Sequence, residues 1–254
     1  MALPNGGAAA LIYYQGVSEP ETADFVLKFL KPGMVFLDIG AHVGEYTLLA
    51  AGAVGSTGEV HVFEANPEIC ELLRHNIQLN GLSNVSVNQC AISDQDGEME
   101  FEVFAEPSVC ALKVQNYSAQ AGAGRRTAVK VLRVQSLRMD RYLPRVKRKV
   151  DLVKIDVEGA ELLVFQGATD LLALAKYQSP TFIFEYEANN YARFGCPAGE
   201  LFALLRRNGF SIWRYNGMAR LDPFDCQLSS GGTVNLVASK DEKWLRHTLS
   251  TAQQ

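Results

Sequence analysis

The segment that decides the fold is Val35-Phe36-Leu37-Asp38-Ile39-Gly40-Ala41-His42-Val43-Gly44. An apolar run broken only by an aspartate is typical of a strand that is buried on both faces. Gly40 lets the chain turn sharply after the strand, and Gly44 permits close packing where the next helix begins. The segment therefore predicts a strand, a glycine turn and a helix, the unit that binds ligands at the carboxyl edge of open α/β sheets.

The chemistry of this turn favours a cationic ligand. Its glycine spacing, G-x-x-x-G, differs from the G-x-G-x-x-G of dinucleotide-binding proteins, which place a pyrophosphate on a helix N-terminus. Asp38 stands just before the turn, where it repels phosphate and suits S-adenosylmethionine (SAM), which carries a sulfonium and an ammonium. The alternative for this segment alone is a plain turn whose glycines serve only geometry. His42 is a candidate base or substrate contact, and otherwise it fills the turn.

Polar residues also end the next two predicted strands. Glu64 ends a strand over residues 58–64 and can accept hydrogen bonds from both hydroxyls of a ribose. Alternatively, it is a carboxylate at the entry of the helix that begins at Pro67. A third strand begins at residue 85 and ends near 92, so Ser93 or Asp94 is a candidate contact for an adenine amino group. Asp94 equally fits a turn before Gly97.

A second group of chemical residues follows the predicted strand over 150–155. Lys154 and Asp156 are two residues apart and point the same way, and a lysine in an apolar strand needs a partner. We expect Lys154 to pair with Asp156, and Asp156 or Glu158 to take the proton of an alcohol acceptor. The pattern predicts a helix over 158–172, where the helix dipole alone accounts for Glu161.

A metal is an alternative way to acidify the acceptor hydroxyl at this edge. Glu185 lies at the end of the predicted strand 181–186, at the same edge of the sheet as Asp156. Asp156 and Glu185 are therefore candidate oxygen ligands for a divalent ion. The sequence alone does not call for one.

Alternating strands and helices predict a mostly parallel sheet covered on both faces. We expect one domain over residues 1–254, with an N-terminal extension over 1–33. A capping box that begins at Ser18 opens a helix there, which runs to about residue 30. A β insertion over 98–134 contains two antiparallel strands. Strands 210–215 and 233–238 have no helix between them, so we expect a hairpin-like pair and a late antiparallel strand.

Composition narrows the class of protein. Hydrophobic residues make up 48% and charged residues 20% of the 254 residues, as in ordinary globular proteins. The formal net charge of −4 gives no footprint for tight binding to nucleic acid. No apolar run is long enough to span a membrane, and the start lacks the basic residues of a signal peptide. The 5 cysteines form no Cys-x-x-Cys motif, so we expect free thiols and a cytoplasmic location.

Four motifs in this order resemble the FkbM-type methyltransferases: residues 37–44, 63–67, 91–94 and 154–161. The resemblance spans about residues 34–187, and it implies a Rossmann-like class I methyltransferase fold. It also implies O-methylation of a hydroxyl on a small molecule or sugar. His42 departs from the small residue or asparagine that many methyltransferases carry in this turn. The SAM-binding residues implied by the resemblance are Asp38, Gly40, Gly44, Glu64 and Asp94.

Other functions fit parts of the same pattern. The segment Glu64-Ala65-Asn66-Pro67 is also similar to tRNA-modifying enzymes, so an RNA methyltransferase is one alternative. The acidic charge and the lack of an appended RNA-binding domain argue against it. A nicotinamide-dependent oxidoreductase is disfavoured by the glycine spacing. A non-catalytic interaction module with a methyltransferase fold is the remaining alternative, and the Asp156 and Glu158 cluster argues against that.

Overall fold

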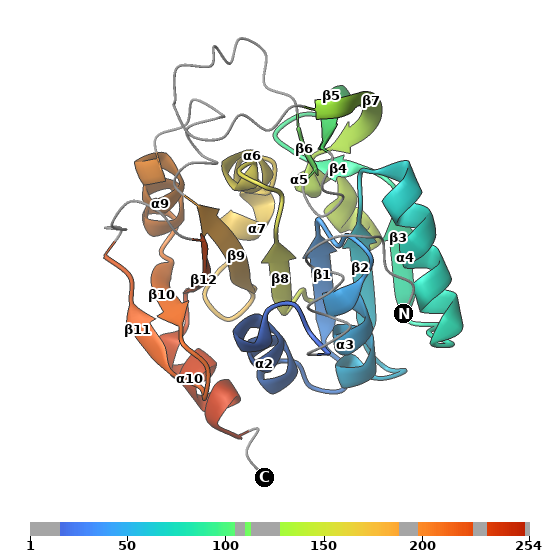
Figure 1. Ribbon diagram of the computed structural model, residues 1–254. Coiled ribbons are helices and arrows are strands. Elements are labelled where there is room, and N and C mark those ends of the chain that lie inside the picture. The colour runs from blue at the N-terminus through green and yellow to red at the C-terminus, as the bar shows by residue number, and fades with distance from the viewer. Residues whose placement is uncertain (1–15, 105–109, 113–127, 188–197, 226–232, 252–254) are drawn as a thin grey trace.

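The computed structural model describes residues 16–104, 110–112, 128–187, 198–225 and 233–251 (Figure 1). A central sheet of eight strands runs in the order β11-β10-β12-β9-β8-β1-β2-β3. Its strands are, in that order, β11 (Leu221–Pro223), β10 (Ser211–Tyr215), β12 (Thr233–Ser239), β9 (Thr181–Glu187), β8 (Leu152–Ile155), β1 (Val35–Ile39), β2 (Glu59–Phe63) and β3 (Val85–Asn88).

The centre of this sheet is parallel, as the sequence predicts. Strand β1 pairs in parallel with β2 on one side and β8 on the other, and β9 continues the parallel set. Every residue of β1 is buried, the carboxylate of Asp38 included. The carboxyl ends of these strands therefore meet at one edge of the sheet, where ligands of such folds bind.

The late antiparallel pair is confirmed, and it lies at one side of the sheet. Strands β10 and β12 are antiparallel, and β12 lies between β9 and β10. The reason is burial. Leu236, Val237 and Ala238 are fully buried, which requires a strand on each side and helices on both faces. The edge is formed by β11, a short strand that the sequence did not predict.

Helices cover both faces of the sheet (Figure 1). One hydrophobic core includes residues of α2, α3, α4 and α10, and the other includes residues of α5, α6, α7 and α9. A single 3-10 turn, η1 (Leu143–Arg145), follows α5. The helices are α2 (Pro20–Phe29), α3 (Glu45–Val54), α4 (Pro67–Leu79), α5 (Met139–Tyr142), α6 (Glu161–Gln166), α7 (Thr169–Ala173), α9 (Ala198–Arg207) and α10 (Glu242–Ser250). None of them combines the length and apolar character needed to cross a bilayer, within the described ranges.

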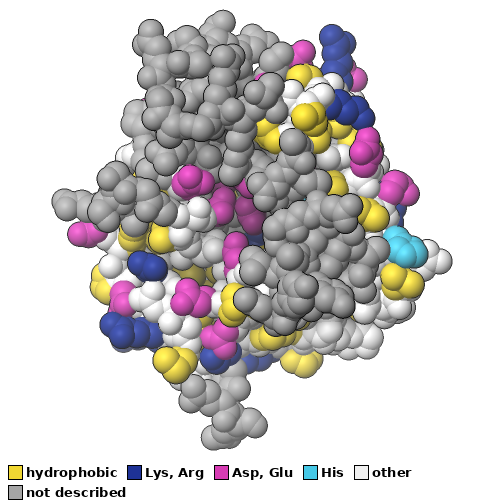
Figure 2. Space-filling view, viewed as in Figure 1, with side chains coloured by type: hydrophobic (Ala, Val, Ile, Leu, Met, Phe, Trp, Pro, Cys, Tyr) yellow, Lys and Arg dark blue, Asp and Glu magenta, His cyan; other side chains and the backbone are white. Residues whose placement is uncertain are grey.

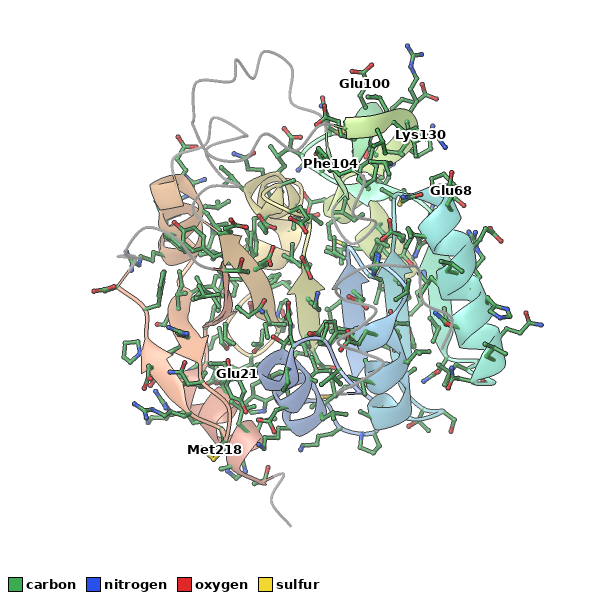
Figure 3. The ribbon with its side chains drawn as sticks, in the orientation of Figure 1. Glu21, Glu68, Glu100, Phe104, Lys130 and Met218 are labelled. Atoms are coloured by element: carbon green, nitrogen blue, oxygen red, sulfur yellow. The ribbon has the colours of Figure 1, made fainter. Side chains whose placement is uncertain are left out.

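A second sheet of four strands forms the insertion. Its order is β4-β7-β5-β6, and the antiparallel pairing of β5 with β7 is the one expected for the insertion. The third predicted strand was too long, because Ala91 and Ile92 leave β3 and pair with β7 instead. Lys130 on β7 forms an exposed ion pair with Glu68 on α4 at 2.8 Å, which joins the second sheet to that helix (Figure 3). The four strands are β4 (Ala91–Ile92), β5 (Gly97–Phe104), β6 (Cys110–Leu112) and β7 (Ala128–Leu137).

The prediction of one long helix over residues 158–172 is wrong, because the structure has two short helices there. Helix α6 begins only at Glu161, and Glu158 lies in the preceding turn. Gly167 ends α6, and the Asp140 carboxylate accepts hydrogen bonds from the backbone N–H groups of Thr169 (3.1 Å) and Asp170 (2.9 Å). These bonds give α7 its own start, so a side chain distant in sequence breaks the helix.

The capping box expected at the first helix is also wrong. Helix α2 begins at Pro20 with Glu19 at its N-cap, and no side chain there accepts a capping hydrogen bond. Ser18 instead donates from its hydroxyl (2.6 Å) and its backbone N–H (2.7 Å) to the carboxylate of Glu45 on α3. The extension therefore packs on the helix that follows β1.

Gly167 offers a test of this packing. A Cβ added at Gly167 would lie 1.9 Å from the backbone oxygen of Ser93, so Gly167→Ala must push two segments apart. We expect it to lower the free energy of unfolding by about 1–3 kcal/mol, measured by urea denaturation. Gly52→Ala is the control, because Gly52 is exposed within α3 with open space around it. That change should raise stability by up to about 1 kcal/mol. Equal effects of the two substitutions would contradict the packing described here.

Candidate active site

Two turns meet at the carboxyl edge of the sheet, one after β1 and one after β8. Asp38 and Lys154 are register partners on these adjacent strands. A Cβ added at Gly40 would lie 1.8 Å from the backbone oxygen of Asp156, and Gly40 has a φ of 79°. The close approach that Gly40 permits is therefore to the second turn, and not only to a ligand. Gly44 packs likewise against Leu73 of α4, as expected for a helix start.

Lys154 is a buried cation among carboxylates. Its Nζ lies 2.9 Å from Asp156 Oδ2, which confirms the expected ion pair, and 4.5 Å from the centre of the Tyr46 ring. Burial opposes its charge, but the carboxylates of Asp156 and Asp38 outweigh that effect and raise the pKa of Lys154. Lys154 therefore stays protonated at neutral pH.

Asp38 lies beneath the first turn and is fully buried. Its Oδ2 accepts a hydrogen bond from the Thr47 hydroxyl at 2.6 Å, which ties β1 to α3. Burial raises the pKa of Asp38, while the charge of Lys154 and the Thr47 hydroxyl oppose the shift. Its Oδ1 is buried and has no hydrogen-bond partner within the described part of the chain.

Glu64 supports the first turn from β2. Its two carboxylate oxygens accept hydrogen bonds from the backbone N–H groups of His42 (2.9 Å) and Asn66 (2.7 Å). Burial raises the pKa of Glu64 to about 7. A carboxylate offers about four lone-pair directions, so Glu64 can accept a further hydroxyl donor. His42 has a left-handed backbone, with φ 51°, so this bond also steadies a conformation that histidine rarely adopts.

Ser93 and Asp94 have different positions at the end of β4. Ser93 is fully buried and donates its hydroxyl to Asp94 Oδ1 at 3.0 Å, so it holds Asp94 from below. Asp94 is half-buried, and its backbone oxygen accepts a hydrogen bond from Arg138 at 2.6 Å. Of the two adenine candidates, Asp94 is therefore the one that reaches the surface of the edge.

The second turn gathers carboxylates on one face. The side chain of Asp156 is 29% exposed, and Glu158 is half-buried with a left-handed φ of 55°. Burial raises the pKa of Glu185 on β9 well above its usual range, and the charges of Asp156 and Glu158 raise it further. Figure 2 shows acidic side chains near the middle of this face. Two non-glycine residues with left-handed backbones, His42 and Glu158, thus lie in the two site turns.

Asp156 and Glu185, the candidate metal ligands, interact through their charges. Across the described ranges, no group of three or more His, Cys, Asp or Glu side chains is placed to hold a metal ion. Within those residues the pair of Asp156 and Glu185 has no third ligand of these types.

The sequence analysis missed the residues that bring the N-terminal extension to this edge. Glu19 Oε2 accepts hydrogen bonds from the Tyr46 hydroxyl (3.0 Å) and from Asn235 on β12 (2.8 Å). Tyr46 also packs its ring on Lys154, so the extension is linked to the buried cation. Tyr46 follows the last glycine of the turn by only two residues, and this position could have indicated that its side chain lies near the site.

Comparison with known proteins now identifies the chain. The family model described as the methyltransferase FkbM domain matches residues 38–212, which is more than half of the chain and contains both turns. The chain belongs to the FkbM methyltransferase family. It is a SAM-dependent methyltransferase, and this excludes the nicotinamide-dependent oxidoreductase considered from the sequence.

Two curated relatives share parts of this FkbM-family sequence. The 31-O-demethyl-FK506 methyltransferase FkbM of Streptomyces tacrolimicus is 26% identical over 237 residues, which cover 83% of this chain and 82% of the relative. A protein-L-isoaspartate O-methyltransferase of Methanococcoides burtonii is 35% identical over 77 residues. That match covers 30% of this chain and 38% of the relative.

A solved structure supports the fold of this FkbM-family protein. A candidate rRNA methylase from Clostridium thermocellum superposes with a TM-score of 0.52 at 11% identity, over 93% of this chain and 97% of that one. At this identity the likeness concerns the fold alone. The predicted class I methyltransferase fold, mostly parallel with antiparallel additions, is confirmed.

The buried carboxyl group of Glu64 predicts a dependence of stability on pH. Its pKa rises from 4.5 to about 7 on folding, so the folded state favours the protonated form. The free energy of unfolding should therefore fall as pH rises from 4.5 through 7, by up to about 3 kcal/mol from this group. In Glu64→Gln the free energy of unfolding should be lower overall, but it should decrease less between pH 4.5 and 7 than in the unchanged protein. Urea denaturation between pH 4.5 and 8 measures both.

The control for this measurement is Glu71→Gln, because Glu71 is an exposed residue of α4. Its profile should parallel that of the unchanged protein. Glu161, whose pKa burial also raises to about 7, should leave a residual slope in both variants. A Glu64→Gln profile as steep as the original would contradict the burial assigned to Glu64.

Proposed function

We propose that this FkbM-family enzyme transfers the methyl group of SAM to a hydroxyl oxygen of a small molecule or sugar, with Asp156 as the general base. The observation that carries the proposal is the partly exposed carboxylate of Asp156, held by the buried Lys154 cation where the two turns meet. Such a carboxylate is accessible and fixed in place, as a proton acceptor needs to be.

The residues of the first turn suit SAM. Asp38 Oδ1 is a buried acceptor without a partner in the described ranges, and it fits a cationic ligand. Glu64 fits the two hydroxyls of a ribose, and Asp94 fits an adenine amino group. Gly40 and Gly44 keep side chains out of the turn. When bound, SAM supplies a methyl group on a positively charged sulfur.

Asp156 is better placed than its neighbours to accept a proton. The ammonium of Lys154 fixes its Oδ2 at 2.9 Å, and the Asp156 side chain is still partly exposed. The raised pKa of Glu185 keeps its carboxyl group neutral, so it can hold an acceptor by donating a hydrogen bond. His42 uses its backbone N–H to hold Glu64, and its ring remains a candidate substrate contact. As the acceptor oxygen takes up the methyl group, its proton passes to Asp156, with Glu158 as the second candidate.

The charges of the site support a neutral or cationic small acceptor. Carboxylates of Asp156 and Glu158 lie beside the proposed reaction point, and they would repel the phosphates of RNA. The net charge of −4 acts in the same direction. The name of the Streptomyces tacrolimicus relative describes methylation at an oxygen of a small molecule, and this is consistent with the proposal.

The test compares Asp156→Asn with the unchanged protein. Calorimetric titration with S-adenosylhomocysteine (SAH), whose sulfur is uncharged, should give dissociation constants within about threefold of each other, because Asp156 is not among the proposed contacts of the first turn, and NAD should not bind. Release of SAH from SAM should be measured with a panel of hydroxylated sugars and macrolactones. With a probe that the unchanged protein methylates, the variant should lose about 10²–10⁴-fold in turnover.

Asp170→Asn is the matched control, because Asp170 is exposed on α7 and should leave both measurements unchanged. Unaltered turnover in Asp156→Asn would remove the assignment of the base. Methylation of RNA, but of no small probe, would replace the proposed acceptor class with RNA.

A further inference from the structure

Glu161 is a buried carboxylate whose surroundings differ from those of an ordinary first-turn glutamate. It is the first residue of α6, where the helix dipole favours a negative charge at the surface. Its residue is only 1% exposed, however, and its side chain turns back toward the loop before the helix. The dipole therefore does not account for its position.

One oxygen of Glu161 clamps the second turn. Glu161 Oε1 accepts hydrogen bonds from the backbone N–H groups of Val157 and Gly159, both at 3.2 Å. Glu158, between these two residues, has a φ of 55°, and Gly159 has a φ of 101°. A left-handed glutamate is strained unless neighbouring groups hold it, whereas glycine adopts a positive φ freely, and Glu161 supplies two bonds on either side of Glu158.

The same turn is held on its other side by the first turn. The backbone oxygen of Asp156 packs against Gly40, and the Asp156 N–H donates to the Ile39 carbonyl at 3.0 Å. Asp156 and Glu158 are thus presented by a loop fixed between Gly40 and Glu161. If the Glu161 bonds are lost, the left-handed turn can relax and carry both carboxylates away.

The second oxygen of Glu161 takes part in no such bond. Oε2 is buried and has no hydrogen-bond partner within the described residues. It can therefore be replaced by an amide NH2 without breaking a bond of the turn. A substitution by glutamine can therefore remove the negative charge of Glu161 and keep the oxygen that accepts both hydrogen bonds.

We propose that Glu161 is a positioning residue for methyl transfer, whose Oε1 holds the left-handed turn that presents Asp156 and Glu158 to the reacting methyl group. The inference rests on the function proposed above. It assigns to Glu161 a structural action on the turn through one oxygen, independent of its negative charge.

Two variants distinguish a positioning role of Glu161 from a role in the helix dipole. Glu161→Gln keeps the carbonyl that accepts both N–H groups and removes the charge. Glu161→Asp keeps the charge at the helix start but shortens the side chain by one methylene, which withdraws the acceptor from Val157 and Gly159. A role in the helix dipole would make the aspartate variant normal and the glutamine variant defective, whereas a positioning role predicts the reverse.

The readout compares the affinities for two cofactor analogues, so no acceptor is required. Sinefungin carries an amine-bearing carbon where SAM carries its methylated sulfur, whereas SAH carries an uncharged sulfur. In the unchanged protein we expect sinefungin to bind about tenfold more tightly than SAH, because its ammonium lies beside the carboxylates of the turn. Calorimetry should show that this preference is kept in Glu161→Gln and falls to within about threefold of equality in Glu161→Asp.

The affinity for SAH and the thermal unfolding midpoint report whether each variant is folded. SAH should bind all three proteins within about threefold, because the first turn is unchanged. A preference retained by the aspartate variant, or lost by the glutamine variant, would overturn the inference. So would equal affinities in the unchanged protein, since the turn would then not face the transferred group. Failure of the unchanged protein to bind SAH would instead refute the proposed function itself.

Discussion

The buried charge of Lys154 is the constraint on which the active site depends. An ammonium this deeply buried is stable only beside opposite charges, and the sheet supplies Asp38 from β1 and Asp156 from the end of β8. The Tyr46 ring packs against the ammonium, and the Tyr46 hydroxyl donates a hydrogen bond to Glu19 in the N-terminal extension. One cation therefore joins the two strands, the helix after the glycine turn and the extension.

The packing of backbone against backbone is the second requirement, and it explains the glycines. The turn after β1 can lie on the turn after β8 only because position 40 has no side chain. On the far side of that second turn, Glu161 provides the bonds that a left-handed Glu158 needs. The carboxylates proposed for catalysis are thus fixed by contacts that do not involve a substrate, as preorganised sites require.

Local pattern predicted the parallel sheet, the order of the motifs and the Lys154–Asp156 pair, since these depend on neighbours along the chain. Errors arose where distant residues decide the structure. Asp140 starts a separate helix at Thr169, and Glu45 accepts hydrogen bonds from Ser18, which was expected to cap α2. The functional interest of Glu161 was hidden because its position equally fits a helix dipole, and only its burial and hydrogen bonds distinguish the two roles.

The most direct test of this account is a crystal structure of the protein bound to SAH. The account predicts that SAH lies over the turn after β1, with its ribose hydroxyls within hydrogen-bond distance of the Glu64 carboxylate. Its sulfur should face the turn that carries Asp156 and Glu158, with no other side chain between. A bound SAH whose sulfur faces away from Asp156, or which occupies another part of the molecule, would contradict the proposed site.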